Sequence, residues 1–391
     1  MRKTWMLAIT FSLILLLTGC AGSVDKAPDA TAPATQEEAG DAALEEALDT
    51  VLSENAEEAA ALETAVEAST EVALEESTES EDGKIHLTMY FVDPPSSPYA
   101  QGGEKIADLV REATDGLIDI EVVASSTLGE RELIEGAMDN EIDIATCANS
   151  VLTNYIPQMN ILDQAYLWKN EKEAHGAVDG SLGELIKQRA LTLGLHVIGF
   201  EESGFRNTFS TKPIQSMADF QGVTIRTMEN KYHQAAFESF GATPVALPYT
   251  KIFEALKEGT VDACENATAN CYNSGYYEIT PNVTFTNHAF VYIVLCMSDE
   301  AWGKIPDQMK DALLAAVGEG VAWERERLTE ANVEAVELLK DLGVSFYDID
   351  VTELQKAYQE KAKEKGFFFD PEWQAAVDEA IEKAASEEGA A

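Results

Sequence analysis

Basic residues are scarce in this 391-residue chain. It holds 27 Lys and Arg against 70 Asp and Glu, so its formal net charge is −43. This charge excludes a nucleic-acid partner, because contact with phosphates requires a positively charged surface. For the same reason, an anionic ligand can bind only where local Lys or Arg side chains override the mean field of the protein.

Catalytic and metal-binding motifs are absent as well. The sequence has no G-x-S-x-G, no P-loop, no H-E-x-x-H and no dinucleotide fingerprint, and its five His are scattered. Four cysteines lack both C-x-x-C spacing and a neighbouring His, which argues against zinc: Cys147, Cys264, Cys271 and Cys296. We therefore expect no enzyme activity, no metal and no cofactor. The disulfide state stays open, with buried free thiols preferred, since four cysteines allow three full pairings.

The first twenty residues have the pattern of a bacterial export signal. Arg2 and Lys3 precede an apolar stretch at 6–17, which is too short for a comfortable membrane span. The stretch leads into L-T-G-C, ending at Cys20, which resembles a lipobox. We therefore expect a lipoprotein signal peptide at 1–19 and lipidation of Cys20. Each acyl methylene buried in the bilayer would contribute about 0.8 kcal/mol to anchoring.

An acidic segment follows the signal. Residues 21–82 hold 19 Asp and Glu against one Lys, and no aromatic residue. Such a segment buries too little apolar surface to offset its ordering entropy, although its Ala-Glu runs permit some helix. We interpret 20–82 as a lipid-anchored, disordered acidic tether, in preference to an acidic interaction tail. The remaining residues, 83–391, carry a net charge of −27.

Residues 83–391 show two blocks in which strand-like and helix-like patterns alternate. The first block predicts strands at 84–92, 117–123 and 142–146, with helices around 106–113 and 133–138. The second predicts strands at 205–210, 223–226, 243–246 and 261–264, with helices around 232–240 and 249–256. This alternation indicates α/β domains with mostly parallel sheets. After residue 306 the apolar spacing predicts a long helix, or a pair, lying across both domains.

Two arginines stand out because the second block is poor in Arg. Arg206 follows Gly204 and Phe205, and Arg226 ends the strand predicted at 223–226. Strand ends in α/β sheets face the ligand cleft, and a guanidinium there can hold a carboxylate through two parallel hydrogen bonds. The alternative that the residues leave open is an arginine paired with one of the many neighbouring acids.

A series of short segments in this region resembles the solute-binding proteins of TRAP transporters, the tripartite ATP-independent periplasmic systems, of the dicarboxylate-binding-protein type. The segments are GFR at 204–206, KPI at 212–214, DFQGVTIR at 219–226, FGATP at 240–244, ALKEGTVD at 255–262, EN at 265–266 and YE at 277–278. LGEREL at 128–133 and Asp143 also fit. The resemblance therefore covers nearly all of 83–391.

The resemblance implies a bilobed fold of the periplasmic-binding-protein type, with two α/β domains around a ligand cleft. Domain I would comprise 83–203 and 293–330, and domain II 204–292 and 331–391, with long C-terminal helices crossing both. Such a protein acts outside the cytoplasmic membrane. It is expected to work as a monomer that captures a small carboxylated solute and delivers it to membrane permease subunits.

The resemblance also implies ligand-binding residues. The family's signature Arg falls on Arg226, which would hold the ligand carboxylate, and further binding positions fall on Arg206, Asn266 and Tyr249. The chain departs from the family where the strand at 142–146 ends, because it lacks a carboxylate that some members have there. Asn149 or Ser150 would substitute as hydrogen-bonding groups.

A second departure is Trp168, which would add a wall to the pocket or pack in the core. These departures leave the acid open between a sugar acid, a C4-dicarboxylate and a keto acid. An extracytoplasmic ligand-sensing subunit is the alternative function, since the same cleft would serve it. A hydrolase or isomerase is disfavoured by the lack of a nucleophile and base pair.

Overall fold

The computed structural model describes residues 83–388 of the chain. The predictions for the signal peptide, for Cys20 and for the tether lie outside the described residues. Within 83–388, none of the helices combines the length and the apolar composition that a membrane span needs.

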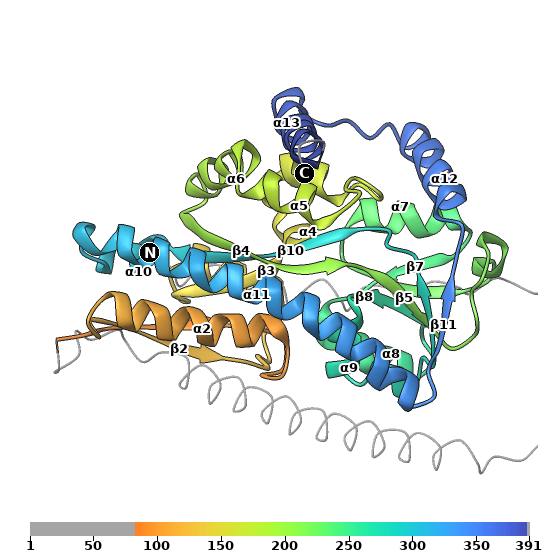
Figure 1. The fold of residues 1–391 in the computed structure, drawn as a ribbon, viewed down its shortest axis with the longest axis horizontal. Coiled ribbons are helices and arrows are strands. Elements are labelled where there is room, and N and C mark those ends of the chain that lie inside the picture. The colour runs from red at the N-terminus through yellow and green to blue at the C-terminus, as the bar shows by residue number, and fades with distance from the viewer. Residues whose placement is uncertain (1–82, 389–391) are drawn as a thin grey trace, which may run out of the picture. The chain divides into compact units, whose positions relative to one another are not determined.

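The first sheet has five strands in the order β2-β1-β3-β10-β4 (Figure 1). β1, β2 and β3 form its parallel part, while β10 runs antiparallel to both β3 and β4. The strands are β1 (Ile85–Tyr90), β2 (Ile118–Val123), β3 (Ile144–Ala148), β4 (Leu195–Phe205) and β10 (Phe290–Ser298). Its helices are α2 (Pro98–Ala113), α3 (Glu130–Met138), α4 (Asn149–Leu152), η1 (Pro157–Asp163), α5 (Glu171–Val178), α6 (Ser181–Leu191) and α10 (Asp299–Lys304).

The second sheet has six strands in the order β11-β9-β5-β8-β6-β7. They are β5 (Asn207–Ser210), β6 (Thr224–Thr227), β7 (Thr243–Ala246), β8 (Ala263–Asn266), β9 (Asn282–Phe285) and β11 (Ser345–Asp348). The helices between them are η2 (Met217–Phe220), α7 (Lys231–Phe240), η3 (Tyr249–Lys251), α8 (Ile252–Lys257), α9 (Thr268–Asn273) and η4 (Tyr276–Glu278). Local signals explain α7, which begins after the capping side chain of Asn230 and ends at Gly241, a left-handed residue with φ 101°.

Most strands of each sheet run in one direction, as predicted, but each sheet is mixed because one strand, β10 in the first and β5 in the second, is antiparallel to both of its neighbours. The two β-α-β-α-β blocks supply the parallel pairs, as expected. The antiparallel pairs arise from β10, which comes from outside the first block, and from β5, which is the first strand of the second block. β10 lies between β3 and β4, and β5 lies between β8 and β9.

The chain crosses between the sheets at two adjacent strand connections. β4 of the first sheet leads through Arg206 directly into β5 of the second, and β9 leads back into β10. The two crossings are hydrogen-bonded to each other, since Arg206 N donates to Ala289 O at 2.9 Å and His288 N donates to Arg206 O at 3.3 Å. The most prominent arginine of the sequence therefore lies at the crossing itself.

Three helices complete the chain: α11 (Asp307–Asp341), α12 (Val351–Glu364) and α13 (Pro371–Glu388). α11 is a single helix that contacts α2 and β4 at one end and α9 at the other, so it runs along both sheets (Figure 1). Glycines permit this close packing, because a Cβ on Gly102 or Gly320 would overlap side chains across the α2–α11 interface. α12 packs on α7, whereas α13 packs on α5 and α6 beside the first sheet. Part of the segment 331–391 thus lies with the first sheet.

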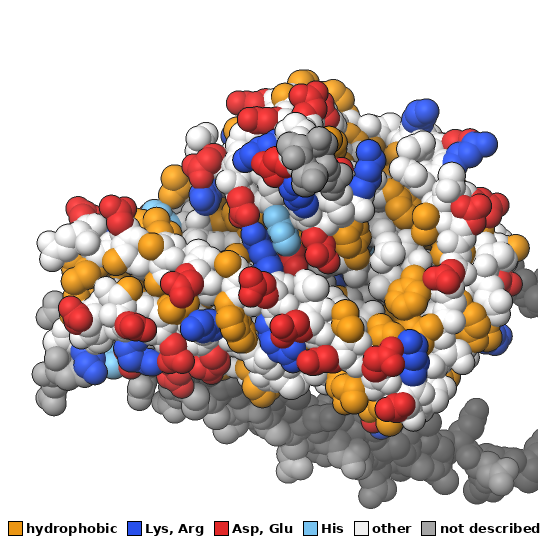
Figure 2. All heavy atoms as spheres, viewed as in Figure 1, with side chains coloured by type: hydrophobic (Ala, Val, Ile, Leu, Met, Phe, Trp, Pro, Cys, Tyr) orange, Lys and Arg blue, Asp and Glu red, His pale blue; other side chains and the backbone are white. Residues whose placement is uncertain are grey.

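On the face of the molecule seen in Figure 2, acidic side chains do not form one continuous patch. Figure 2 shows that, on the face viewed, Asp and Glu are scattered among Lys, Arg and apolar side chains. The strong net charge is therefore a diffuse field, which any anionic ligand must overcome locally.

Candidate ligand-binding site

A cavity lies where the ends of the parallel strands of both sheets meet. It has a larger part of about 130 Å³ and a smaller part of about 30 Å³, which share Glu130, Arg226 and Met228. The smaller part is also lined by Asp93, Tyr99, Ser203, Arg206, Tyr249, Asn266 and Asn270, among others. Arg206 and Arg226 are each only 3% exposed, so the structure is a closed form of the site.

Arg206 is held by a buried carboxylate on the neighbouring strand. Its Nε donates to Glu265 Oε2 at 2.5 Å and its Nη2 donates to Glu265 Oε1 at 3.0 Å, which is a two-pronged ion pair. Its Nη1 donates to Asn266 Oδ1 at 2.6 Å. Burial alone would raise the pKa of Glu265, but the charge and hydrogen bond of Arg206 together with those of His288 outweigh it and hold that pKa well below its usual range. The N–H groups of Arg206 are thus committed to the protein.

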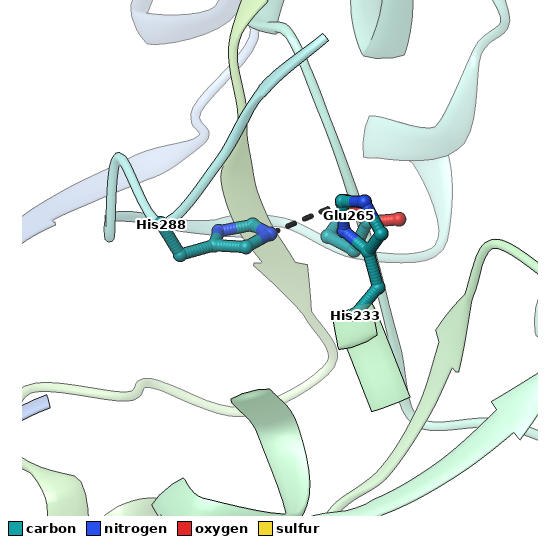
Figure 3. Close-up of side chains that lie close together, drawn as sticks. All are labelled: His233, Glu265 and His288. Carbon is teal, nitrogen blue, oxygen red and sulfur yellow. Dashed lines mark hydrogen bonds and ion pairs between the residues drawn. The ribbon is translucent and has the colours of Figure 1, made fainter. Parts of the chain in front are cut away.

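A buried histidine supports Glu265 from the other side. His288 Nε2 lies 3.3 Å from Glu265 Oε2 (Figure 3). The other ring nitrogen of His288, Nδ1, lies 3.0 Å from Thr286 Oγ1. Burial lowers the pKa of His288 despite the neighbouring carboxylate. A neutral ring whose Nε2–H donates to Glu265 and whose Nδ1 accepts from Thr286 satisfies both contacts.

His233, Glu265 and His288 also have the composition of a metal site. Their possible ligand atoms lie within 4.8 Å of one another, and Figure 3 shows them close together. Both Glu265 oxygens, however, already accept from Arg206, and Arg226 Nη1 lies 3.5 Å from Glu265 Oε1. A divalent cation there would lie beside two guanidinium groups. We therefore assign no metal to this cluster.

Arg226 differs from Arg206 in having donors to spare. Its Nε donates to Leu247 O at 2.8 Å, and its only ion-pair contact within 83–388 is the long 3.5 Å approach to Glu265. Burial lowers the pKa of Arg226, and the nearby charge of Arg206 adds to the effect. Arg226 is thus a buried guanidinium that lines both parts of the cavity and has no two-pronged partner among the described residues, so its remaining donors could hold an anion.

Asn266 and Tyr249 extend this polar wall. Asn266 Nδ2 donates to Asn270 Oδ1 at 2.8 Å, so its orientation is fixed while its side chain lines the cavity. Tyr249 has its hydroxyl 2.7 Å from Ser274 Oγ, and its partly buried ring lines the smaller part of the cavity. The structure thus gathers four of the predicted residues around one space: Arg226, Arg206, Asn266 and Tyr249.

The other three predicted binding residues lie elsewhere. Asn149 is fully buried, donates to Asp163 at 3.1 Å and accepts from Tyr292 N at 2.9 Å. Ser150 contacts the sulfur of Met228 at 3.0 Å, and Trp168 is packed into the core around β10. In the closed form these three side chains do not line the cavity, and their role in binding stays a prediction.

Two acidic residues of the cavity were missed by sequence reasoning. Asp93 lies in the loop between β1 and α2 and is 6% exposed, and Glu130 is the first residue of α3. Glu130 accepts from Ala148 N at 2.7 Å. Burial raises the pKa of both carboxyl groups, and Glu130 adds to the effect on Asp93. The signal for Glu130 was its place at a helix start within LGEREL, whereas Asp93 had only its position after a strand.

Comparisons with known proteins agree with this geometry. Residues 90–367 match the family model described as bacterial extracellular solute-binding protein, family 7. The chain is 27% identical over 243 residues to the 2,3-diketo-L-gulonate-binding periplasmic protein of Escherichia coli, covering 62% of this chain and 74% of that protein. It is 23% identical over 281 residues to the C4-dicarboxylate-binding periplasmic protein of Rhodobacter capsulatus, covering 71% and 84%.

A solved structure shows the same architecture. The TRAP periplasmic solute-binding protein of Polaromonas sp. JS666, bound to D-erythronate, superimposes with a TM-score of 0.70 at 28% identity, covering 75% of this chain and 98% of that one. Fold and site together define a bilobed extracytoplasmic solute-binding protein. The chain belongs to bacterial extracellular solute-binding protein family 7. The predicted resemblance and the predicted bilobed α/β fold are therefore confirmed.

Proposed function

We propose that this chain captures a small organic acid outside the cytoplasmic membrane and delivers it, without catalysis, to a TRAP-type secondary transporter. The observation that carries the proposal is Arg226, a buried guanidinium that faces the cavity with unused donors. Arg206 has a different role in this proposal. Its guanidinium is committed to Glu265 and Asn266, so it fixes the position of Asn266 in the cavity wall that the ligand would contact.

The charges around the cavity favour a sugar acid among the three candidate classes. The charge of Arg206 is matched by Glu265, so Arg226 has capacity for one ligand carboxylate. Across the cavity, Asp93 and Glu130 offer oxygen acceptors for hydroxyl donors. The second carboxylate of a C4-dicarboxylate would meet these acids instead, and a short keto acid would leave them without donors.

The same class of ligand occurs among relatives of this chain. One relative is named for 2,3-diketo-L-gulonate and one solved relative holds D-erythronate, and both are monocarboxylates with several oxygen groups. The relative named for C4-dicarboxylates is less similar to this chain in identity. These names support a sugar acid, and the acids of the cavity wall provide the physical reason for it.

The remaining features of the proposal concern attachment and domain organisation. We infer that Cys20 carries a lipid anchor, that 20–82 is a tether, and that the binding unit works as a monomer beside its permease. We also infer two domains that hinge at the β4–β5 and β9–β10 crossings. Because α13 packs on α5 and α6, domain II would end near residue 370, and 371–388 would belong with domain I.

A thermal-shift screen tests the proposed function. The panel compares D-erythronate, D-glucuronate, D-galacturonate and 2,3-diketo-L-gulonate with succinate, malate and pyruvate. A ligand present at 100 times its Kd stabilises the folded protein by about 2.7 kcal/mol, so a binder raises the Tm clearly. We expect sugar acids to raise the Tm of the wild type and to leave that of Arg226→Ala unchanged. A larger response to succinate or malate would contradict the choice of sugar acid.

A further inference from the structure

We propose that the protein takes up about one proton with each organic-acid anion that it binds, and that Asp93 receives this proton. The inference rests on the proposed function, because the bound anion is what drives the protonation. The observation behind it is the position of Asp93, whose carboxyl group lines the cavity proposed to bind an organic-acid anion.

Asp93 is fixed in a buried position by its neighbours. Its backbone carbonyl accepts from Ser125 N at 2.8 Å, and its Oδ1 accepts from Asn270 Nδ2 at 2.7 Å. The side chain borders the smaller part of the cavity, which Arg226 also lines. No Lys, Arg or His of the described residues lies within ion-pair distance of its carboxylate. The ionised form of Asp93 is therefore supported by hydrogen bonds from the neutral side chains of Asn270 and Tyr249, but by no ion pair among the described residues.

The groups that face Asp93 are mostly acidic. Glu130 approaches from α3 and Glu201 from β4, and Glu324 of α11 lies behind Glu201. Glu201 is fully buried, and neither of its carboxylate oxygens has a hydrogen-bond partner among the described residues. The neutral groups nearby are Tyr99 of α2, Tyr249 of η3 and Asn270 of α9.

The cations near Asp93 do not balance these acids. Arg206 is committed to Glu265, and its charge lowers the pKa of Asp93 less than the hydrogen bonds from Asn270 and Tyr249 do. Arg226 is the cation that the ligand itself would occupy, while Arg131 lines only the larger part of the cavity. Burial, followed by Glu130, raises the pKa of Asp93 to about 7 in the closed form without ligand.

An anion in this cavity shifts the balance further. A carboxylate held by Arg226 adds a negative charge near Asp93 and removes water, and both changes disfavour ionised Asp93. Protonated Asp93 can also donate its O–H to a ligand oxygen, which the carboxylate cannot do. The pKa of Asp93 is then higher in the complex than in the free, open protein, so a proton binds as the ligand binds.

The other acids are weaker candidates for the proton. Glu130 accepts a hydrogen bond from Ala148 N, and the charges of Arg226 and Arg206 both favour its ionised form. Glu201 and Glu324 lie behind the wall and do not line the cavity. Glu132 and Glu229 also line the larger part of the cavity, but Glu132 is exposed and Glu229 is only half-buried. Among the acids of the described residues that line the cavity, Asp93 is thus the buried one without a cation at ion-pair distance.

The coupling between ligand binding and protonation of Asp93 determines how the affinity depends on pH. Affinity is greatest at a pH below the pKa of Asp93 in the free protein. It falls by up to about tenfold per pH unit as the pH rises towards the pKa in the complex, and then levels off. The ligand carboxylate is ionised throughout the range from about pH 6 to 8.5, so its own titration does not contribute.

Calorimetry in two buffers tests the inference. The sugar acid that gives the largest thermal shift in the panel, with D-erythronate as the first probe, is titrated at pH 7.5 in phosphate and in Tris. The difference between the observed enthalpies gives the number of protons exchanged. We expect an uptake of about one proton for the wild type, and an affinity at pH 8.5 at least tenfold weaker than at pH 6.

Three variants assign the proton. Asp93→Asn should bind without proton uptake and with an affinity independent of pH, because the amide is neutral at every pH. Glu130→Gln should retain the uptake even where its affinity changes. Asp108→Asn, on the exposed face of α2, is the matched control and should behave as the wild type does. Thermal unfolding of each ligand-free variant confirms that it is folded.

The outcomes separate the two proposals. If no acid of the panel binds the wild type at either pH, the proposed function is contradicted and the coupling falls with it. Binding with equal enthalpy in both buffers contradicts the coupling alone. Proton uptake that persists in Asp93→Asn, or that disappears in Glu130→Gln, overturns the assignment to Asp93.

Discussion

Truncation of the two arginines of the site should affect different properties: Arg226→Ala should weaken ligand binding, whereas Arg206→Ala should lower the stability of the fold. Arg226→Ala removes a guanidinium whose Nε donates to Leu247 O and whose contact with Glu265 is long, at 3.5 Å. Glu265 keeps its two-pronged partner Arg206 and its contact with His288 in this variant. Arg206→Ala, in contrast, leaves the carboxylate of Glu265 buried without that partner.

The magnitudes follow from burial. Removing one partner of a largely desolvated charge pair costs about 2–5 kcal/mol, so Arg226→Ala should weaken sugar-acid binding roughly 30-fold to several thousand-fold. Arg226→Ala should change the free energy of unfolding of the unliganded protein only slightly, because burial and the repulsion from Arg206 already disfavour the charge of Arg226. Arg206→Ala should lower the free energy of unfolding by about 3–5 kcal/mol, the usual cost of breaking a buried ion pair.

Two measurements on each variant separate these effects. Calorimetry with the sugar acid found in the thermal-shift panel gives the affinity, and urea unfolding of the ligand-free protein gives the stability. Arg226→Lys keeps the charge but loses the two-pronged geometry, so its affinity should lie between those of the wild type and Arg226→Ala. Folded Arg226→Ala that binds within threefold of the wild type would refute the carboxylate clamp. Equal losses of stability in Arg226→Ala and Arg206→Ala would refute the different roles of the two arginines.

Three further predictions concern other parts of the molecule. Burial, followed by the charge of Glu324, raises the pKa of Glu201. The contribution of Glu201 to folding stability should therefore be fully present below the ordinary pKa of a glutamate. It should fall by up to about 1.4 kcal/mol for each pH unit as the pH rises from there through the raised pKa. Glu201→Gln should therefore reduce the loss of stability between pH 5 and pH 8 in urea unfolding, and an unchanged slope would contradict this. Asn230 Nδ2 donates to Asp163 Oδ2 at 2.7 Å, so Asn230→Asp, which keeps the cap of α7 but sets two buried carboxylates together, should lower the free energy of unfolding by about 1–3 kcal/mol; wild-type stability in urea unfolding would count against it. Cys20→Ser should release the protein from membranes or leave its precursor uncleaved, and unchanged fractionation with full acyl labelling would exclude the lipid anchor.

The local elements of the fold could be predicted from the sequence because their signals lie within a few residues. The apolar alternation at 84–92 and the helical spacing at 232–240 correspond to β1 and α7. The crossing strands could not be predicted in the same way. β10 is a nine-residue buried strand whose partners, β3 and β4, lie far back in the chain. Nothing in its apolar composition specifies an antiparallel place between them.

The site was predicted in part for a similar reason. Arg226 and Arg206 are conspicuous because cations are rare in an acidic chain, and the resemblance to a known family assigned their roles. Asp93 and Glu130 are two acids among 70, so their composition gave no signal. Only the three-dimensional structure shows that both are withdrawn from solvent and border the cavity of Arg226. The distinction between Arg206 and Arg226 likewise depends on which of them Glu265 contacts closely.

The position of Arg206 connects ligand binding to the movement of the domains. Arg206 lies between β4 and β5, is hydrogen-bonded through its backbone to the returning crossing, and holds Glu265 and Asn266 of β8 through its side chain. A ligand shifts a conformational equilibrium only by the difference between its affinities for the two states. In this protein the ligand would gain that difference when Arg226 on one sheet and Asp93 and Glu130 beside the other surround it together. If opening at the two crossings separates these groups, as the proposed hinge requires, variants of Arg226 and Asp93 should change the closed population only when ligand is present. Small-angle scattering should therefore show a smaller radius of gyration on ligand addition for the wild type but not for Arg226→Ala, with identical curves for the two proteins when ligand is absent. A ligand-free difference between them would show that Arg226 holds the domains together by itself.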